Sequence, residues 1–314
     1  MREVDFIGEG LNRPESVLTT AKGEIFVSDH ACGVFQLGTQ KPTLTGIPNG
    51  FLPNGVALTR EREFLVANLG SSCGGGIWRI DRQYCLHPWL MEVDGIPLTV
   101  ANFVGFDEAG RTWISMCTHK VPREDAFNAH TPDGFVAVCD SRGSRVVAEG
   151  IGFANECRVD PSGLWLYVNE TYGRCLSRFA ILGGSDWKLG SKEVVHRFSD
   201  GDFPDGLSFD SEGGAWVACV VSNRIIRIAQ DGDVQIMLED PDQDTINRVE
   251  LHFASGGVSR ADIDAGGTRS LGNTSSVAFG GSDLRTVYVG CLSGTRLATF
   301  RSPFSGAKPA HWHF

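Results

Sequence analysis

The sequence predicts an all-β protein with the fold of a six-bladed β-propeller. One phrase recurs six times along the 314 residues, and almost no stretch shows the 3.6-residue period of an amphipathic helix. Glycine is abundant, with 39 residues, as the tight turns of antiparallel sheets require. We expect one propeller domain over residues 1–314. A β-sandwich is the alternative, but it does not explain a sixfold phrase.

Each copy of the phrase begins with a polar residue, continues with alternating apolar positions, and passes through a turn into an apolar strand. The copies span residues 15–29, 54–68, 102–116, 155–170, 205–219 and 275–290. In four copies a glycine stands eight positions after the first residue, where it supplies the positive φ of a hairpin turn. These glycines are Gly23, Gly110, Gly163 and Gly213.

Further strands lie between the copies, at residues 76–80, 133–138, 175–181 and 223–229. Each unit is therefore expected to contain four short strands in about 52 residues, close to the length of known blade repeats. The interval between the fifth and sixth copies is longer. It contains a Gly- and Asp-rich loop, residues 239–267, that we expect to be a surface excursion or a lid over the channel.

Composition limits the classes of partner and the compartment. The formal net charge is -10 and no basic run occurs, which argues against a nucleic-acid surface. The charged start MREVDFIGEG lacks the apolar stretch of a secretory signal or membrane anchor. The nine cysteines form no C-x-x-C pair, which favours reduced thiols over disulfides or a zinc site. We therefore expect a cytoplasmic protein without membrane partners; the sequence does not indicate an oligomeric state.

The six residues that begin the copies are the candidates for chemistry. In a propeller, equivalent positions surround one axis at the same height, so these residues are expected to meet. They are Glu15, Asn54, Asn102, Asn155, Asp205 and Ser275. Asn and Asp also favour turns before strands, which is a structural explanation for them, but Glu has no such preference. A ring of oxygen donors suits a hard divalent cation, Ca²⁺ first, with Mg²⁺, Mn²⁺ and Zn²⁺ as other possibilities.

Several of these phrases resemble a known family. RPESV, ANFVGFDEAGRTW, FANECRVDPSGLWLYVNET and FPDGLSFDSEGGAWVA, with the closing LSGTRLATF, are similar to the senescence-marker-protein, gluconolactonase and luciferin-regenerating-enzyme family. Its regucalcin-like members are six-bladed propellers with lactone-hydrolysing activity. The resemblance implies a metal held by four residues, a set like that of the related diisopropylfluorophosphatase propellers. These are Glu15, Asn102, Asn155 and Asp205.

Two departures from the family pattern concern the substrate. Sugar lactonases commonly carry Arg-x-Asn-Asp-Gly around the second ligand, whereas this chain has VANFV at residues 100–104. Asn155 is followed by Glu156 where glycine is usual. With Val100, Phe103 and Phe153 expected near the rim, we expect a lactone less polar than a sugar-acid lactone; packing between blades is the alternative role for these apolar residues.

The resulting hypothesis is a metal-dependent hydrolase that opens a lactone. Asp205 would also activate water as a general base, and Asn102 would orient the substrate oxygen. The alternatives are a phosphotriesterase or arylesterase with the same centre, and a non-catalytic binding propeller. A binding propeller would not need a ring of Glu, Asn and Asp at its axis.

Other patterns carry weaker signals. GSSCG at residues 70–74 matches a nucleophile elbow around Ser72, but a strand follows where the elbow needs a helix. The run of Asp240, Asp242 and Asp244 imitates a calcium loop without its invariant glycine. His119 or His130 could serve as a proton shuttle at the channel mouth, although exposed histidines are commoner. The recurring tryptophans are expected to pack between blades; they are Trp78, Trp113, Trp165 and Trp216.

Overall fold

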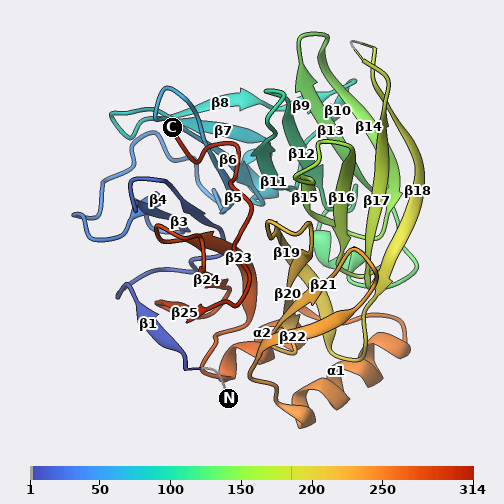
Figure 1. The fold of residues 1–314 in the computed structure, drawn as a ribbon. Helices are drawn as coiled ribbons and strands as arrows, with labels where there is room; N and C mark the ends of the chain where they lie inside the picture. Colours follow the sequence, from blue (N-terminus) through green and yellow to red (C-terminus); the bar gives the residue numbers. More distant parts are fainter. Residues whose placement is uncertain (1–2, 185) are drawn as a thin grey trace.

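The computed structural model describes residues 3–184 and 186–314, and within them six antiparallel sheets are arranged radially around one axis (Figure 1). This confirms the predicted six-bladed β-propeller and excludes the β-sandwich. In each sheet the first strand of the repeated phrase is innermost. These inner strands contact one another in a closed ring, in the order β2, β5, β11, β15, β19 and β23.

In the described part of the chain, the first sheet has three strands and the other five have four. The first contains β2 (Val17–Thr19), β3 (Ile25–Asp29) and β4 (Gly33–Gln36). The second contains β5 (Pro53–Leu58), β6 (Phe64–Asn68), β7 (Ile77–Ile80) and β8 (Leu86–Leu90). The third contains β11 (Ala101–Phe106), β12 (Thr112–Met116), β13 (Gly134–Asp140) and β14 (Gly143–Ile151).

The fourth sheet contains β15 (Ala154–Val159), β16 (Trp165–Glu170), β17 (Cys175–Leu182) and β18 (Lys188–Arg197). The fifth contains β19 (Asp202–Phe209), β20 (Ala215–Val221), β21 (Arg224–Ile228) and β22 (Val234–Glu239). The sixth contains β23 (Thr274–Gly280), β24 (Thr286–Cys291), β25 (Leu297–Arg301) and the N-terminal β1 (Asp5–Ile7). A small hairpin, β9 (Glu92–Val93) and β10 (Ile96–Pro97), follows the second sheet.

The sixth sheet joins the two ends of the chain, because β1 pairs antiparallel with β25, Asp5 opposite Thr299. This outermost strand comes from the start of the sequence, so the ring is closed by hydrogen bonds between chain ends. The expectation of four strands per unit was wrong for the first sheet. Its segment after β4 has no fourth strand, and the strand that precedes the first repeat serves the sixth sheet instead.

The turns between the two inner strands follow the predicted pattern. The four glycines of the repeat have φ of 74° to 81°, the left-handed region that a hairpin turn demands. Arg62 stands at the equivalent place in the second copy and adopts the same conformation, with φ 64°. The turn is therefore kept even where the sequence provides no glycine.

Apolar side chains fill the spaces between neighbouring blades. Trp78, Trp113 and Trp216 are buried there and Trp165 is partly buried, which confirms the packing role expected of them.

All nine cysteines lie in the described residues as free thiols, six of them buried. Burial raises the pKa of the Cys117 thiol to about 12, which keeps it protonated.

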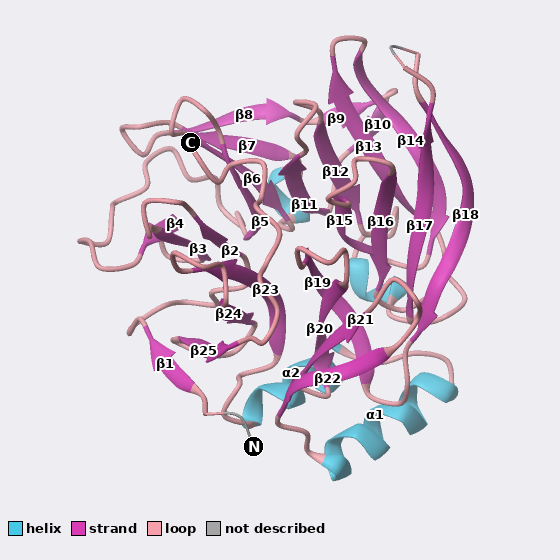
Figure 2. Ribbon diagram, in the orientation of Figure 1, coloured by secondary structure: helices cyan, strands magenta, loops and turns pink. Residues whose placement is uncertain are grey.

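The segment predicted as a Gly- and Asp-rich loop, residues 239–267, is largely helical, so the prediction of a loop was wrong. It contains α1 (Gln243–Ala254), α2 (Arg260–Asp264) and the start of a 3₁₀ turn, η3 (Ala265–Thr268). The Asp242 side chain caps α1 by accepting from the backbone N–H groups of Asp244 and Thr245, so the aspartate run begins a helix. Figure 2 shows both helices on one side of the molecule, beside β19–β22.

Two other 3₁₀ turns lie in connections, η1 (Ser71–Cys73) and η2 (Arg123–Ala126). No helix in the described ranges is long and apolar enough to cross a membrane.

Candidate metal centre

The repeated polar residues stand at irregularities of the inner strands. In five of the six blades, as far as the structure describes them, the pairing register between the inner strand and its neighbour shifts at this residue. Such a bulge breaks the alternation of side chains and turns one of them in a new direction. The residues concerned are Asn54, Asn102, Asn155, Asp205 and Ser275.

Glycine after the polar residue lets neighbouring inner strands approach closely. A Cβ on Gly206 would lie 2.4 Å from the carbonyl oxygen of Ser275 on the adjacent strand. No side chain fits there, so Gly206 allows the strands that carry Asp205 and Ser275 to be in backbone contact.

A small cavity of about 50 Å³ lies on the axis, and all four predicted metal ligands line it. Each of them is at most 5% exposed. Asn54 also lines the cavity, whereas the Ser275 hydroxyl donates a hydrogen bond to the backbone oxygen of Glu15 at 3.0 Å. The structure therefore gathers residues separated by up to 190 positions, as the repeat predicted. The four are Glu15, Asn102, Asn155 and Asp205.

Two of these side chains present oxygen atoms that nothing in the described chain satisfies. Glu15 accepts from Asn54 Nδ2 through Oε1 at 2.9 Å, but its buried Oε2 has no hydrogen-bond partner there. Asn155 donates through Nδ2 to Thr171 Oγ1 at 3.1 Å, and its buried Oδ1 likewise has no partner. Orphaned buried acceptors are costly, so they suggest that a cation belongs at this position.

The two other amides differ in role. Asn102 donates through Nδ2 to Cys117 Sγ at 3.3 Å, which leaves Oδ1 with one long contact, 3.3 Å, from Asn54 Nδ2. Asn54 instead accepts through Oδ1 from Arg13 Nη1 at 2.9 Å and directs its nitrogen to Glu15 and Asn102. Asn54 therefore supports the ligand set and does not offer an oxygen to it.

Burial dominates the electrostatics of the cavity. Burial raises the pKa of Glu15 well above its usual range, opposed by Arg13. Burial and the nearby Glu156 raise the pKa of Asp205 to about 7. Glu156 itself is held by Arg158 at 2.9 Å and by the Leu207 N–H at 3.1 Å. Two carboxylates and two amide oxygens fit a hard divalent cation such as Ca²⁺, which takes six to eight oxygens.

No cluster of three or more His, Cys, Asp or Glu side chains suited to a metal occurs within residues 3–184 and 186–314. The candidate centre therefore depends on its two amide oxygens.

Sequence reasoning missed three arginines and much of an aromatic wall around the cavity. Arg13, Arg123 and Arg260 line it, although the motif arginine of the sugar lactonases is absent. Phe127 and Tyr172 join Phe153 in one cluster with ring centroids 4.8 to 5.4 Å apart. Arg123, Phe127 and Arg260 come from connections outside the repeat, so its pattern could not indicate them.

The apolar residues predicted at the rim divide into two groups. Phe153 lines the cavity, as expected. Val100 and Phe103 do not: both are 1% exposed and pack in the core between blades, so their predicted place at the rim was wrong. The bulge turns Asn102 alone toward the axis, and the Phe103 ring lies under the guanidinium of Arg158, 4.8 Å from its carbon.

The remaining candidates lie elsewhere. His119 and His130 are exposed and do not line the cavity; the His119 ring packs against Phe135. Ser72 lies in η1, between β6 and β7, without the helix that a nucleophile elbow requires. Residues 239–267 do contribute to the site, through Arg260 and Ile263.

Comparison with solved structures supports the fold. A luciferin-regenerating enzyme aligns with a TM-score of 0.67 at 15% identity, over 99% of both chains. The calcium-binding protein regucalcin from Agrobacterium tumefaciens aligns with a TM-score of 0.66 at 14% identity, over 98% of both chains. A gluconolactonase from Xanthomonas campestris aligns with a TM-score of 0.66 at 16% identity, over 96% of this chain and 90% of that one.

Comparison of sequences is more specific. A 6-deoxy-6-sulfogluconolactonase from Pseudomonas putida is 27% identical over 148 residues, 46% of this chain and 40% of that protein, so the match spans less than half of the relative. The family model described as SMP-30/Gluconolactonase/LRE-like region matches residues 20–248, which is more than half of the chain. The matched segment includes Asn102, Asn155 and Asp205. The chain therefore belongs to the SMP-30/gluconolactonase/LRE-like family.

Proposed function

We propose that this protein is a metal-dependent lactonase, a hydrolase that opens a cyclic ester with the help of one divalent cation, Ca²⁺ first. The observation that carries the proposal is the pair of orphaned oxygens, Glu15 Oε2 and Asn155 Oδ1, buried in a cavity with two carboxylates. Family membership and the lactonase names of two relatives support the reaction class. The name of the regucalcin relative, a calcium-binding protein, supports the cation.

The proposed ligands are Glu15, Asn102, Asn155 and Asp205. When bound, the cation would act as a Lewis acid toward the carbonyl oxygen of the lactone and favour the oxyanion that forms during attack. Glu15 and Asp205 would neutralise its charge. Asn54 would keep Glu15 in place through the 2.9 Å hydrogen bond that it donates.

Asp205 would handle the proton. Its carboxylate accepts a proton from water as the water oxygen attacks the carbonyl carbon, and that proton then passes to the ring oxygen as the ring C–O bond breaks. The product is a hydroxy acid, so atoms and charge balance with one water consumed. Asn102 orients the substrate oxygen, and the wall of Phe127, Phe153 and Tyr172 excludes bulk water from the ring.

The test is acid release from a panel of lactones, aryl esters and phosphotriesters, measured with added Ca²⁺ and with excess chelator. We expect lactone hydrolysis that the chelator abolishes and that Asp205→Ala removes in a folded protein. Asp231→Asn, an exposed aspartate in a distant turn, serves as the control that keeps activity. Faster turnover of phosphotriesters or aryl esters would assign one of those reactions instead. Full lactonase activity in chelator would refute metal dependence.

A further inference from the structure

Within the described chain, the cavity combines three arginines with two carboxylates. Arg13 precedes β2, Arg123 begins η2, and Arg260 begins α2. The lining therefore carries one positive charge in excess, and a bound divalent cation would add two more. Such a site attracts anions.

Arg13 already has hydrogen-bond partners within the protein. Its Nη1 donates to Asn54 Oδ1 at 2.9 Å and lies 3.3 Å from His30 Nε2, so it holds the amide that in turn holds Glu15. Burial lowers the pKa of Arg13, Glu15 opposes this, and the charges of Arg123 and Arg260 lower it further. Arg123 and Arg260 are thus close enough to Arg13 for their charges to act on it.

Arg123 is the least satisfied of the three. Its side chain is 15% exposed, and the nearest carboxylate oxygen, Glu124 Oε1, lies 3.6 Å from Nε. Over residues 3–184 and 186–314 the structure contains no hydrogen bond from this guanidinium. A largely buried cation with so weak a partner is unfavourable unless a ligand supplies the missing anion.

Most N–H donors of the Arg260 guanidinium have no hydrogen-bond partner among the described residues. Its Nη2 donates to Asp264 Oδ1 at 2.6 Å, one turn along the same helix, and its side chain is 34% exposed. Among the described residues this is its one hydrogen bond, although a guanidinium has five N–H donors. Asp264 therefore anchors the side chain and leaves its other edge available to a ligand.

The segments that carry Arg123 and Arg260 are held to each other. The backbone N–H of Val258, two residues before α2, donates to the carbonyl oxygen of Phe127, just after η2, at 2.8 Å. A Cβ on Gly257 would lie 2.8 Å from the same oxygen, so the two connections are in backbone contact. They form one cover over the cavity, and this fixes both arginines relative to the aromatic wall.

We propose that Arg123 and Arg260 bind a negatively charged substituent on the substrate, so that the preferred substrate is a lactone bearing a carboxylate or similar oxyanion. The lactone ring would lie against Phe127, Phe153 and Tyr172. This inference rests on the proposed function and replaces the expectation of a less polar substrate. A guanidinium pair is well suited to it, because arginine donates two parallel hydrogen bonds to an oxyanion.

The test compares two lactones with the same ring, 5-oxotetrahydrofuran-2-carboxylate and its neutral analogue 5-(hydroxymethyl)dihydrofuran-2-one, in the full chain with Ca²⁺. We expect the double variant Arg123→Gln/Arg260→Gln to raise KM for the carboxylate by about 10- to 100-fold, as the loss of charge-assisted hydrogen bonds predicts. KM for the neutral lactone should change less than about threefold, since its ring contacts remain. Arg82→Gln, an exposed arginine outside the cavity, is the matched control.

A parallel change for both lactones would overturn the proposal, because it would place the arginines on the product carboxylate that every lactone yields. An unchanged KM for the charged lactone would overturn it as well. If the wild type hydrolyses neither lactone, the proposed function fails. Binding of tetrahydrofuran-2-carboxylate, methanesulfonate and inorganic phosphate by calorimetry then decides the anion site: loss of binding in the double variant supports it, and equal binding refutes it.

Discussion

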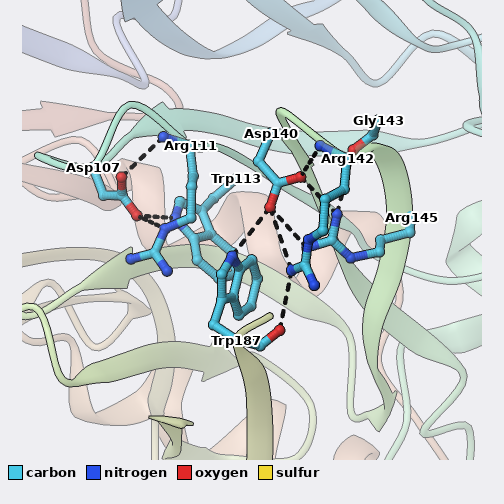
Figure 3. Close-up of polar contacts among 8 residues, drawn as sticks. All are labelled: Asp107, Arg111, Trp113, Asp140, Arg142, Gly143, Arg145 and Trp187. Carbon is cyan, nitrogen blue, oxygen red and sulfur yellow. Dashed lines mark hydrogen bonds and ion pairs between the residues drawn. The ribbon is translucent and has the colours of Figure 1, made fainter. Parts of the chain in front are cut away.

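The contact between the third sheet and the β17–β18 connection holds three arginines, two aspartates and two tryptophans (Figure 3), and the axial cavity holds three arginines, two carboxylates and three aromatic rings. In the first cluster every carboxylate is paired. Asp140 accepts from Arg145 through both oxygens at 2.8 Å, and Asp107 accepts from Arg111 Nε at 2.5 Å. The indole N–H groups complete both sets, Trp113 toward Asp107 and Trp187 toward Asp140.

In the axial cavity the same kinds of groups remain incomplete. Glu15 Oε2 has no partner in the described structure, and Arg123 has one carboxylate at 3.6 Å. The pKa values of the carboxylates move in opposite directions: hydrogen bonds from Arg145 lower that of Asp140, whereas burial raises those of Glu15 and Asp205. The protein alone satisfies the cluster around Asp107 and Asp140, and we propose that a bound cation and substrate complete the groups of the axial cavity.

The largest expected effect separates chemistry from folding at Asp205. We expect Asp205→Asn to lower kcat by about 10³-fold, because it would remove the proposed general base and weaken the proposed metal site. The melting temperature of the metal-free protein should stay the same or rise, since the change removes a buried charge close to Glu156. Initial rates and thermal denaturation in chelator test this. A folded variant with wild-type rates contradicts the assignment.

The second effect concerns the cation itself. Ca²⁺ at 100 times its Kd should stabilise the wild type by about 2.7 kcal/mol, because it binds the folded state alone. Glu15→Gln should lose most of this stabilisation, while Asp231→Asn should keep it. Thermal denaturation over a range of Ca²⁺ concentrations is the measurement. Equal stabilisation of Glu15→Gln and wild type would show that Ca²⁺ binds elsewhere.

The third effect concerns the cluster around Asp107 and Asp140 (Figure 3). Asp140→Asn should destabilise the protein by about 1–3 kcal/mol, because the bidentate contact with Arg145 is lost and the arginine remains partly buried. Lactone hydrolysis should be unchanged. Urea denaturation measures the loss of stability, and initial rates measure lactone hydrolysis. Asp283→Asn, at an exposed pair with Arg301, is the matched control and should have a much smaller effect.

The sequence predicted the axial ring because the phrase carries its polar residue at the same place in every copy. Glu15 and Asp205 could therefore be brought together without knowledge of the fold in detail. The cover over the cavity has no such repeat. Arg123 and Arg260 stand in connections that occur once, and nothing in their neighbouring residues indicates the direction of either side chain.

Two structural details were also out of reach of the sequence. The helix α1 buries Thr245, Ile246 and Val249, too few apolar positions to distinguish a helix from a Gly- and Asp-rich loop. The bulge at Asn102 decides that this residue faces the axis while Phe103 faces the core. Strict alternation along the strand describes neither the position nor the effect of such a bulge.

The smallest expected effect is that the destabilisation caused by Asp140→Asn depends on pH. Hydrogen bonding to Arg145 lowers the pKa of Asp140 in the folded state, so its contribution to stability is complete above the ordinary aspartate value, about 3.9, and is lost as the pH falls through the lower folded value. The difference in unfolding free energy between wild type and Asp140→Asn should therefore be larger at pH 5 than at pH 3. Urea denaturation at both pH values measures it. A difference that stays constant would mean that packing of Trp187 and Arg142, and not the charge of Asp140, holds the cluster together.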